Sequence, residues 1–158
     1  MDTAIELDFA DGRYNFWLAF PQIIELERNC GRKLTDGTTQ SKSVFQIYDE
    51  LSEGIGIGRD DGAAKFVGGG TANALDIKEV VRLGLIGGNS GIVDGTEKEV
   101  GPLTARNLVS DYIEARPLSE GLAVAWMVLN AAIVGVDLKK KAEEPAETPA
   151  DMSPSGKG

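Results

Sequence analysis

The hydrophobic residues of this chain are most concentrated in residues 117–136, PLSEGLAVAWMVLNAAIVGV. Pro117 suits the first turn of a helix, where its missing N–H is no loss, and Glu120 complements the helix dipole. From Leu122 to Val136 nearly every residue is apolar, with Asn130 as the exception. A helix that is apolar on all sides must be buried in a protein core or a bilayer. Because the run is shorter than the roughly 20 residues of a membrane span, it predicts a central core helix.

The N-terminal residues follow a different pattern, in which apolar and polar side chains alternate. Residues 3–9, TAIELDF, place their large apolar side chains on one face and their acidic side chains on the other, which is typical of a half-buried strand. Asp11-Gly12 is a strong turn signal, and residues 14–20 alternate again. The chain is therefore predicted to open with a β-hairpin.

Four further segments have apolar residues at the three-and-four spacing of amphipathic helices. They cover residues 21–29, 43–53, 76–86 and 103–114. Ser43 and Asp76 are expected to cap their helices, and Gly87-Gly88 to end the third. The polar or glycine-rich segments between them, residues 32–42, 54–70 and 91–101, are expected to be loops, with short extended pieces left open in the second.

These elements predict a mainly α fold with an N-terminal β-hairpin (α+β), a small helical domain around a central apolar C-terminal helix. Residues 1–136 form this domain. Residues 137–158 contain few large apolar side chains, so they cannot bury enough surface to offset the entropy of ordering them. We expect them to form a disordered tail.

The amino-acid composition disfavours several classes of function. The formal charge is −9 and the pI is near 4.5, which disfavours binding to nucleic acid phosphates. Histidine is absent, which removes the commonest general base and metal ligand, and the single cysteine excludes an intramolecular disulfide. The N-terminus lacks the basic and apolar regions of a signal peptide, so we expect a cytoplasmic protein.

The motifs that suggest chemistry each have a simpler interpretation. Gly54-Ile55-Gly56-Ile57-Gly58 follows a predicted helix and lacks phosphate-loop spacing, so it indicates a flexible linker. The acidic stretches 59–62 and 94–97 lack the ligand pattern of a calcium loop and are predicted to be solvated turns. Cys30, Trp17 and Trp126 are expected to be structural. No catalytic, cofactor-binding or metal-ligating residue is predicted, although general acid–base chemistry by paired carboxylates stays open.

A set of packing and turn residues resembles a known family. The set consists of Asp11-Gly12-Arg13-Tyr14, Ile24-Glu25-Leu26-Glu27, Gly31, Ile47, Leu51, Asp76-Ile77-Lys78-Glu79-Val80, Leu83-Gly84-Leu85-Ile86-Gly87-Gly88, Pro117-Leu118 and Ala132-Ile133-Val134-Gly135. In this order they are similar to the tail assembly chaperones of gene transfer agents and siphophages, some of which are labelled tail tube proteins. The resemblance covers most of residues 5–136, and the segments 54–70 and 91–101 are longer than in the compact members.

The resemblance implies a non-enzymatic adaptor that binds the tape measure protein and recruits tail tube subunits before the tube polymerises. It implies neither a cofactor nor a nucleic acid or membrane partner, and it is compatible with a homo-oligomer. Two alternatives stay open. One is a structural tail tube subunit, which the single predicted hairpin disfavours because tube walls are rich in strands. The other is an unrelated small interaction domain or enzyme.

Overall fold

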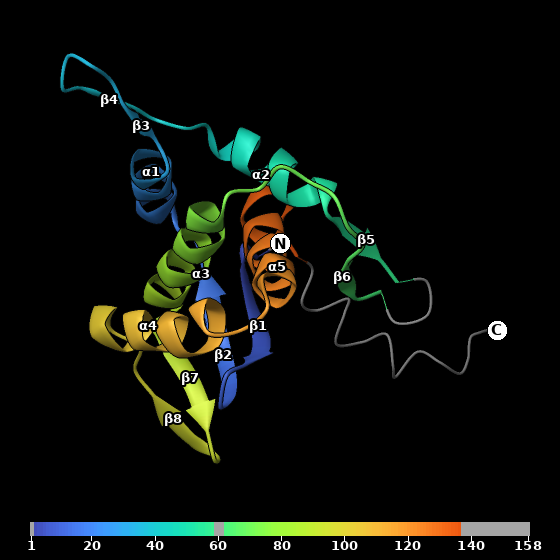
Figure 1. Ribbon diagram of the computed structural model, residues 1–158. Coiled ribbons are helices and arrows are strands. Elements are labelled where there is room, and N and C mark those ends of the chain that lie inside the picture. The colour runs from blue at the N-terminus through green and yellow to red at the C-terminus, as the bar shows by residue number, and fades with distance from the viewer. Residues whose placement is uncertain (1, 59–61, 137–158) are drawn as a thin grey trace, which may run out of the picture.

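The computed structural model describes residues 2–58 and 62–136, which form a mixed α/β fold (Figure 1). Its main sheet is antiparallel, with the strand order β1-β2-β7-β8. The strands of this sheet are β1 (Ala4–Phe9), β2 (Gly12–Trp17), β7 (Ser90–Val93) and β8 (Thr96–Lys98). The helices are α1 (Phe20–Asn29), α2 (Val44–Glu53), α3 (Ala74–Gly88), α4 (Pro102–Val109), the π-helical turn η1 (Ser110–Glu114) and α5 (Leu118–Val134).

The predicted N-terminal hairpin is confirmed. β1 and β2 pair with Ile5 opposite Phe16 and Phe9 opposite Gly12, so the alternating apolar side chains share the face that meets the helices. Of the turn predicted at residues 10–13, Ala10 and Asp11 connect the strands, with Ala10 at a φ of 57°, while Gly12 and Arg13 already belong to β2. The other face of the sheet is open to solvent and carries polar residues such as Arg13, whose guanidinium pairs with carboxylates of β1.

The prediction of a mainly α domain around the C-terminal helix is wrong. Three segments that were expected to be loops contain hairpins, and one of them, β7–β8, extends the N-terminal hairpin into the four-stranded sheet. The other two are the small hairpins β3 (Arg32–Lys33) with β4 (Thr39–Gln40) and β5 (Ile55–Ile57) with β6 (Ala64–Phe66). These strands are two to four residues long, too short for an alternating pattern to identify them in the sequence.

The central helix is α3, not α5. α3 packs against β2 on one side and α5 on another, and it also contacts α1 and α4. Gly84 marks this position, because a side chain there would meet both Val128 of α5 and Phe16 of β2. Figure 1 shows α3 (green) between α1 and α5, in front of the sheet. The core of the domain therefore lies between the sheet and the α3–α5 pair.

α5 exists as a helix close to the predicted bounds, but only one of its faces is fully buried. Its other faces are half-covered by α2 and by the β5–β6 hairpin. Asn130, the polar exception in the apolar run, accepts a hydrogen bond of 2.7 Å from the Tyr48 hydroxyl. Trp126 donates its indole N–H to Ser52, 2.9 Å away. α5 is apolar on several faces because different elements each cover part of it, and not because it lies at the centre of the domain.

A buried ion cluster ties the segment before α2 to α2 and α3. The ammonium of Lys42 lies 2.6 Å from Glu50 and 2.5 Å from Asp76, and the Asp76 side chain is almost completely buried. Burial would lower the pKa of Lys42, but the hydrogen bonds to Asp76 and Glu50 outweigh it and raise that pKa. Asp76 is therefore an internal ion partner rather than the predicted N-cap, a place that Asn73 takes without a capping hydrogen bond from its side chain.

Other boundaries depart less from expectation. Ser43 caps α2 as predicted, because its hydroxyl accepts a hydrogen bond from the Phe45 N–H. The helix predicted over residues 103–114 is α4 followed by the π-helical turn η1. Among the described residues, none of the helices has both the length and the apolar character needed to cross a bilayer. The predicted tail, residues 137–158, lies outside the described residues.

Candidate binding pocket between α3 and α4

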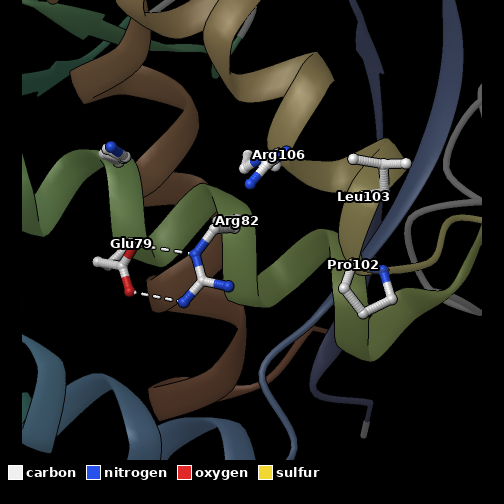
Figure 2. Close-up of a pocket in the computed structure, with 6 residues that line it drawn as sticks. Glu79, Arg82, Pro102, Leu103 and Arg106 are labelled. Carbon is white, nitrogen blue, oxygen red and sulfur yellow. Dashed lines mark hydrogen bonds and ion pairs between the residues drawn. The ribbon is translucent and has the colours of Figure 1, made fainter.

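A pocket of about 500 Å³ lies where α4 crosses α3 (Figure 2). It is lined by Lys78, Glu79 and Arg82 of α3 and by Pro102, Leu103 and Arg106 of α4. Lys78 and Arg82 are four residues apart on α3, so they lie on the same face of that helix. The lining thus holds three cations and one carboxylate, although the whole chain carries a net charge of −9.

Arg82 is held in one orientation by Glu79. Its Nε and Nη2 donate to the two carboxylate oxygens of Glu79 at 2.9 and 2.7 Å, and Figure 2 shows both contacts. Asn29 of α1 donates to the same carboxylate at 2.9 Å, and Glu25 lies 3.8 Å from Arg82. Paired donors of this kind fix the plane of the guanidinium, so Arg82 forms a rigid wall of the pocket.

The protonation of the Glu79–Arg82 pair follows from this geometry. Burial would raise the pKa of Glu79, but hydrogen bonds from Arg82 and Asn29 outweigh burial and hold the pKa below its usual value. The hydrogen bond to Glu79 raises the pKa of Arg82. Both groups are therefore charged at neutral pH, and the pair adds no net charge to the pocket.

The other two cations of the pocket, Lys78 and Arg106, are more accessible to an external ligand than Arg82. Lys78 pairs with Glu114 of η1 at 3.2 Å, and both side chains are more than 40% exposed. Arg106 is exposed and makes no ion pair with any residue in the described part of the chain. In Figure 2 its side chain extends from α4 towards Arg82. Arg106 is thus the cation in this pocket with the most capacity to bind an external carboxylate.

The pocket has an apolar end formed by the first turn of α4. Pro102 suits this first turn because it has no N–H to leave unpaired, and Leu103 follows it with 61% of its surface exposed. Figure 2 places both residues at the opposite end of the site from Glu79. A ligand that fits the pocket therefore combines an apolar group with a negative charge, as a segment of a protein does.

The structure places the sequence motifs in different parts of the fold. The glycine-rich stretch 54–58 is not a linker, because Ile55–Ile57 forms β5. Asp94 and Gly95 form the turn between β7 and β8, with φ values of 52° and 78°, so that prediction of a turn is confirmed. Of the acidic stretch 59–62, residues 59–61 lie outside the described residues.

The three residues expected to be structural differ in burial. Cys30 is buried, and burial together with the nearby Asp76 carboxylate raises the pKa of its thiol, so the thiol is protonated at neutral pH. Trp126 is half-buried and packs against the core. Trp17 is 41% exposed on the open face of the sheet, so its predicted place in the core is wrong. Trp17 follows Phe16 in β2, so its side chain lies on the opposite face of the strand. Because Phe16 faces the core, this alternation explains why Trp17 is exposed.

In residues 2–58 and 62–136, no group of three or more histidine, cysteine, aspartate or glutamate side chains is arranged to hold a metal ion. Lys78, Arg82 and Arg106 belong to no sequence motif that indicates binding. The spacing of the first two on α3 is readable from the sequence, but the approach of Arg106 depends on how α4 crosses α3.

Comparisons with known proteins found no matching protein-family profile, no matching curated protein and no matching solved structure.

The Glu79–Arg82 pair predicts a dependence of stability on pH. Because the folded-state pKa of Glu79 is lowered, the ionised carboxylate stabilises the fold above the ordinary glutamate pKa of about 4.3, and this contribution disappears as the pH falls through the lowered value. We expect Glu79→Gln to lower the free energy of unfolding by about 2 kcal/mol at pH 7. Urea unfolding of both proteins from pH 7 to pH 3 measures the effect.

The difference between the wild type and Glu79→Gln should shrink as the pH falls. The control is Glu97→Gln, which changes an exposed carboxylate on β8 and should leave stability within about 0.5 kcal/mol at either pH. If Glu79→Gln lowers the free energy of unfolding by the same amount at pH 7 and pH 3, the ionised carboxylate is not the source of the stabilisation, because a purely steric effect does not depend on pH.

Proposed function

We propose that this protein is a tail assembly chaperone of a gene transfer agent or siphophage type. In this role it acts in the cytoplasm, binds the tape measure protein and recruits tail tube subunits, and it catalyses no reaction. The proposal rests on the family resemblance of the packing and turn residues in the sequence. Its partners are proteins rather than nucleic acid or membrane, consistent with the net charge of −9.

The observation that carries the proposal is the position of the motif residues in the fold. Gly87 and Gly88 lie where α3 touches the backbone of β2, and Gly84 lies where α3 meets α5. Leu26 and Val80, from two other parts of the motif, are completely buried. Several residues that carry the resemblance are therefore packing residues of this fold, whereas others, such as Leu118 and Val134, are more than half exposed. The buried members of the set support the proposal.

The surface of the domain supports a protein partner. Several large apolar side chains are exposed, among them Leu103 beside the cationic pocket between α3 and α4. An acidic domain with exposed apolar contacts suits a protein that keeps a longer, aggregation-prone chain in solution, because its charge opposes self-association of the complex.

Co-expression tests the proposal. The tape measure protein of the same gene cluster, produced alone and together with this protein, is compared for solubility and for elution on size exclusion. We expect it to become soluble and to co-elute only in the presence of this protein. A tape measure protein that is equally soluble alone and never co-elutes would rule out the chaperone.

A structural tail tube subunit is the second candidate, and the four-stranded sheet favours it more than the sequence did. In the described part of the sheet, β1 and β8 each have one neighbouring strand, so both edges can in principle pair with another subunit. This candidate predicts that the purified protein assembles into rings or tubes, which negative-stain electron microscopy would detect. A protein that stays monomeric at high concentration contradicts it.

A further inference from the structure

The lining of the pocket between α3 and α4 has a charge opposite to that of the chain. Its six residues include three cations, Lys78, Arg82 and Arg106, and one carboxylate, Glu79. The whole chain, by contrast, has 25 acidic and 16 basic residues. A local excess of cations attracts an anion to this place, whereas the field of the whole acidic chain opposes the approach of highly charged anions.

Arg82 has hydrogen-bonding capacity that its own partners do not use. Its Nε and Nη2 donate to Glu79, and a carboxylate oxygen of Glu25 lies 3.8 Å from Nη2. Its third nitrogen, Nη1, has no hydrogen-bond partner in residues 2–58 and 62–136. Because the paired contact with Glu79 fixes the plane of the guanidinium, Nη1 is held in one direction with its N–H groups available to a ligand.

Arg106 supplies a second guanidinium to the same pocket. It is exposed on α4, and it makes neither an ion pair nor a side-chain hydrogen bond with any residue that the structure describes. Figure 2 shows its side chain extending from α4 towards Arg82. Two guanidinium groups that face each other repel, and a carboxylate between them replaces this repulsion with charge-assisted hydrogen bonds. The two arginines therefore form an arrangement that an anion completes.

The apolar end of the pocket favours an organic acid over an inorganic anion. Leu103 exposes 61% of its surface and follows Pro102 in the first turn of α4. An apolar group attached to a bound carboxylate can cover Leu103 and remove apolar surface from water. Inorganic phosphate has no such group, and its higher charge is opposed by the acidic chain. The pocket volume of about 500 Å³ also falls within the range of about 300–1,000 Å³ that is typical of small-ligand sites.

We propose that this pocket binds a carboxylate that carries an apolar group, with the carboxylate between Arg82 Nη1 and the Arg106 guanidinium and the apolar group against Leu103. Such a ligand has two sources, a free organic acid and an acidic side chain beside an apolar one in another protein. The inference rests on the pocket alone and does not depend on the proposed chaperone function, because the family resemblance does not identify this site.

Arg106→Gln tests the cationic end of the site, and the chain offers a close control. Arg28, like Arg106, is an exposed arginine in the last turn of a helix, but it lies on α1 and does not line the pocket. Arg106→Gln and Arg28→Gln therefore remove the same charge from equivalent helix positions. Leu103→Ala tests the apolar end. Its control is Leu118→Ala, because Leu118 is also an exposed leucine that follows a proline at the start of a helix but does not line this pocket.

The experiment is an NMR titration of isotope-labelled protein with sodium acetate and sodium hexanoate. We expect hexanoate to shift the guanidinium N–H signals of Arg82 and Arg106 and to leave those of Arg28 unchanged. Arg106→Gln should bind hexanoate about tenfold more weakly than the wild type, because a hydrogen bond between charged groups is lost, and Arg28→Gln should bind as the wild type does. The wild type should bind hexanoate about tenfold more tightly than acetate. Leu103→Ala should lose this preference, and Leu118→Ala should keep it.

A third ligand separates the two sources of the carboxylate. A peptide with blocked ends that contains one leucine beside one glutamate is titrated in parallel with hexanoate. Tighter binding of the peptide supports the site as one for a protein partner. Tighter binding of hexanoate supports it as one for a free organic acid.

Three results would overturn the carboxylate site. One is that neither hexanoate nor the peptide shifts the Arg106 signal, and another is that Arg106→Gln binds as tightly as the wild type. The third is that inorganic phosphate binds as tightly as hexanoate, because the apolar group then contributes nothing. A failure of the tape measure protein to co-elute would leave these measurements unchanged, so the failure of the chaperone function and the failure of the carboxylate site are distinguishable.

Discussion

Replacing Lys42 by methionine is expected to lower the free energy of unfolding by about 3–5 kcal/mol. The Lys42 ammonium contacts Glu50 and Asp76, and the side chains of Lys42 and Asp76 are 11% and 2% exposed. Methionine keeps most of the side-chain volume but removes the charge, so Asp76 loses its ion partner while it stays buried. Chemical denaturation at pH 7 measures the loss.

The controls separate charge from packing. Lys33→Met removes an exposed lysine on β3 and should change stability by less than about 0.5 kcal/mol. The double variant Lys42→Met/Asp76→Asn removes the more deeply buried of the two carboxylate charges that Lys42 had paired, and it should be more stable than Lys42→Met alone by at least about 1 kcal/mol. If the double variant is the less stable of the two, the ion pair is not the source of the effect.

Replacing Gly87 by alanine is expected to cost about 3 kcal/mol or more, at the upper end of the usual penalty for overpacking. A Cβ atom at Gly87 would lie 1.9 Å from the carbonyl oxygen of Trp17, a backbone atom of β2 that cannot turn away. Helix propensity alone predicts the opposite sign, because alanine stabilises a helix interior by about 0.5–1 kcal/mol relative to glycine. The sign of the change thus decides between the two effects.

Thermal unfolding of Gly87→Ala beside Gly101→Ala provides the test. Gly101 precedes α4 and has no atom within 4 Å of an added Cβ, so its replacement should cost less than about 1 kcal/mol. A Gly87→Ala protein as stable as the wild type would mean that α3 does not pack against β2 as closely as described.

The glycines of α3 show how far the sequence could predict this fold. Gly87-Gly88 indicates the end of a helix by composition, and α3 does end at Gly88 with Asn89 in the left-handed conformation. Their main role is different, since both allow the helix to touch the β2 backbone. Such a contact depends on which strand lies beside the helix, and local sequence does not contain that information.

Longer elements with a clear period could be predicted, and shorter ones could not. The hairpin at residues 4–17 follows from alternation, α1 to α4 follow from three-and-four spacing, and α5 follows from its continuous apolar run. β7 and β8 have four and three residues, and only tertiary pairing with β2 identifies β7 as part of the sheet. Missing these strands led to the wrong fold class.

The pocket between α3 and α4 was hidden from the sequence for a similar reason. Lys78, Glu79 and Arg82 belong to one helix, and their common face could be predicted. Arg106 and Leu103 join them only because α4 packs across α3, and that contact between two helices is not readable from local sequence. The buried Lys42 was likewise hidden, since an isolated lysine in a polar segment gives no sign of a partner 34 residues away.

The backbone of Asp2 pairs with that of Val136 through two hydrogen bonds of 2.9 and 2.7 Å. The pairing is antiparallel, so the N-terminal side of Asp2 and the C-terminal side of Val136 lie at the same end of the bridge. Tension applied between these two points would open the hydrogen bonds one at a time, as in unzipping, rather than load them together in shear. This bridge therefore resists little force, because its two hydrogen bonds are loaded one after the other.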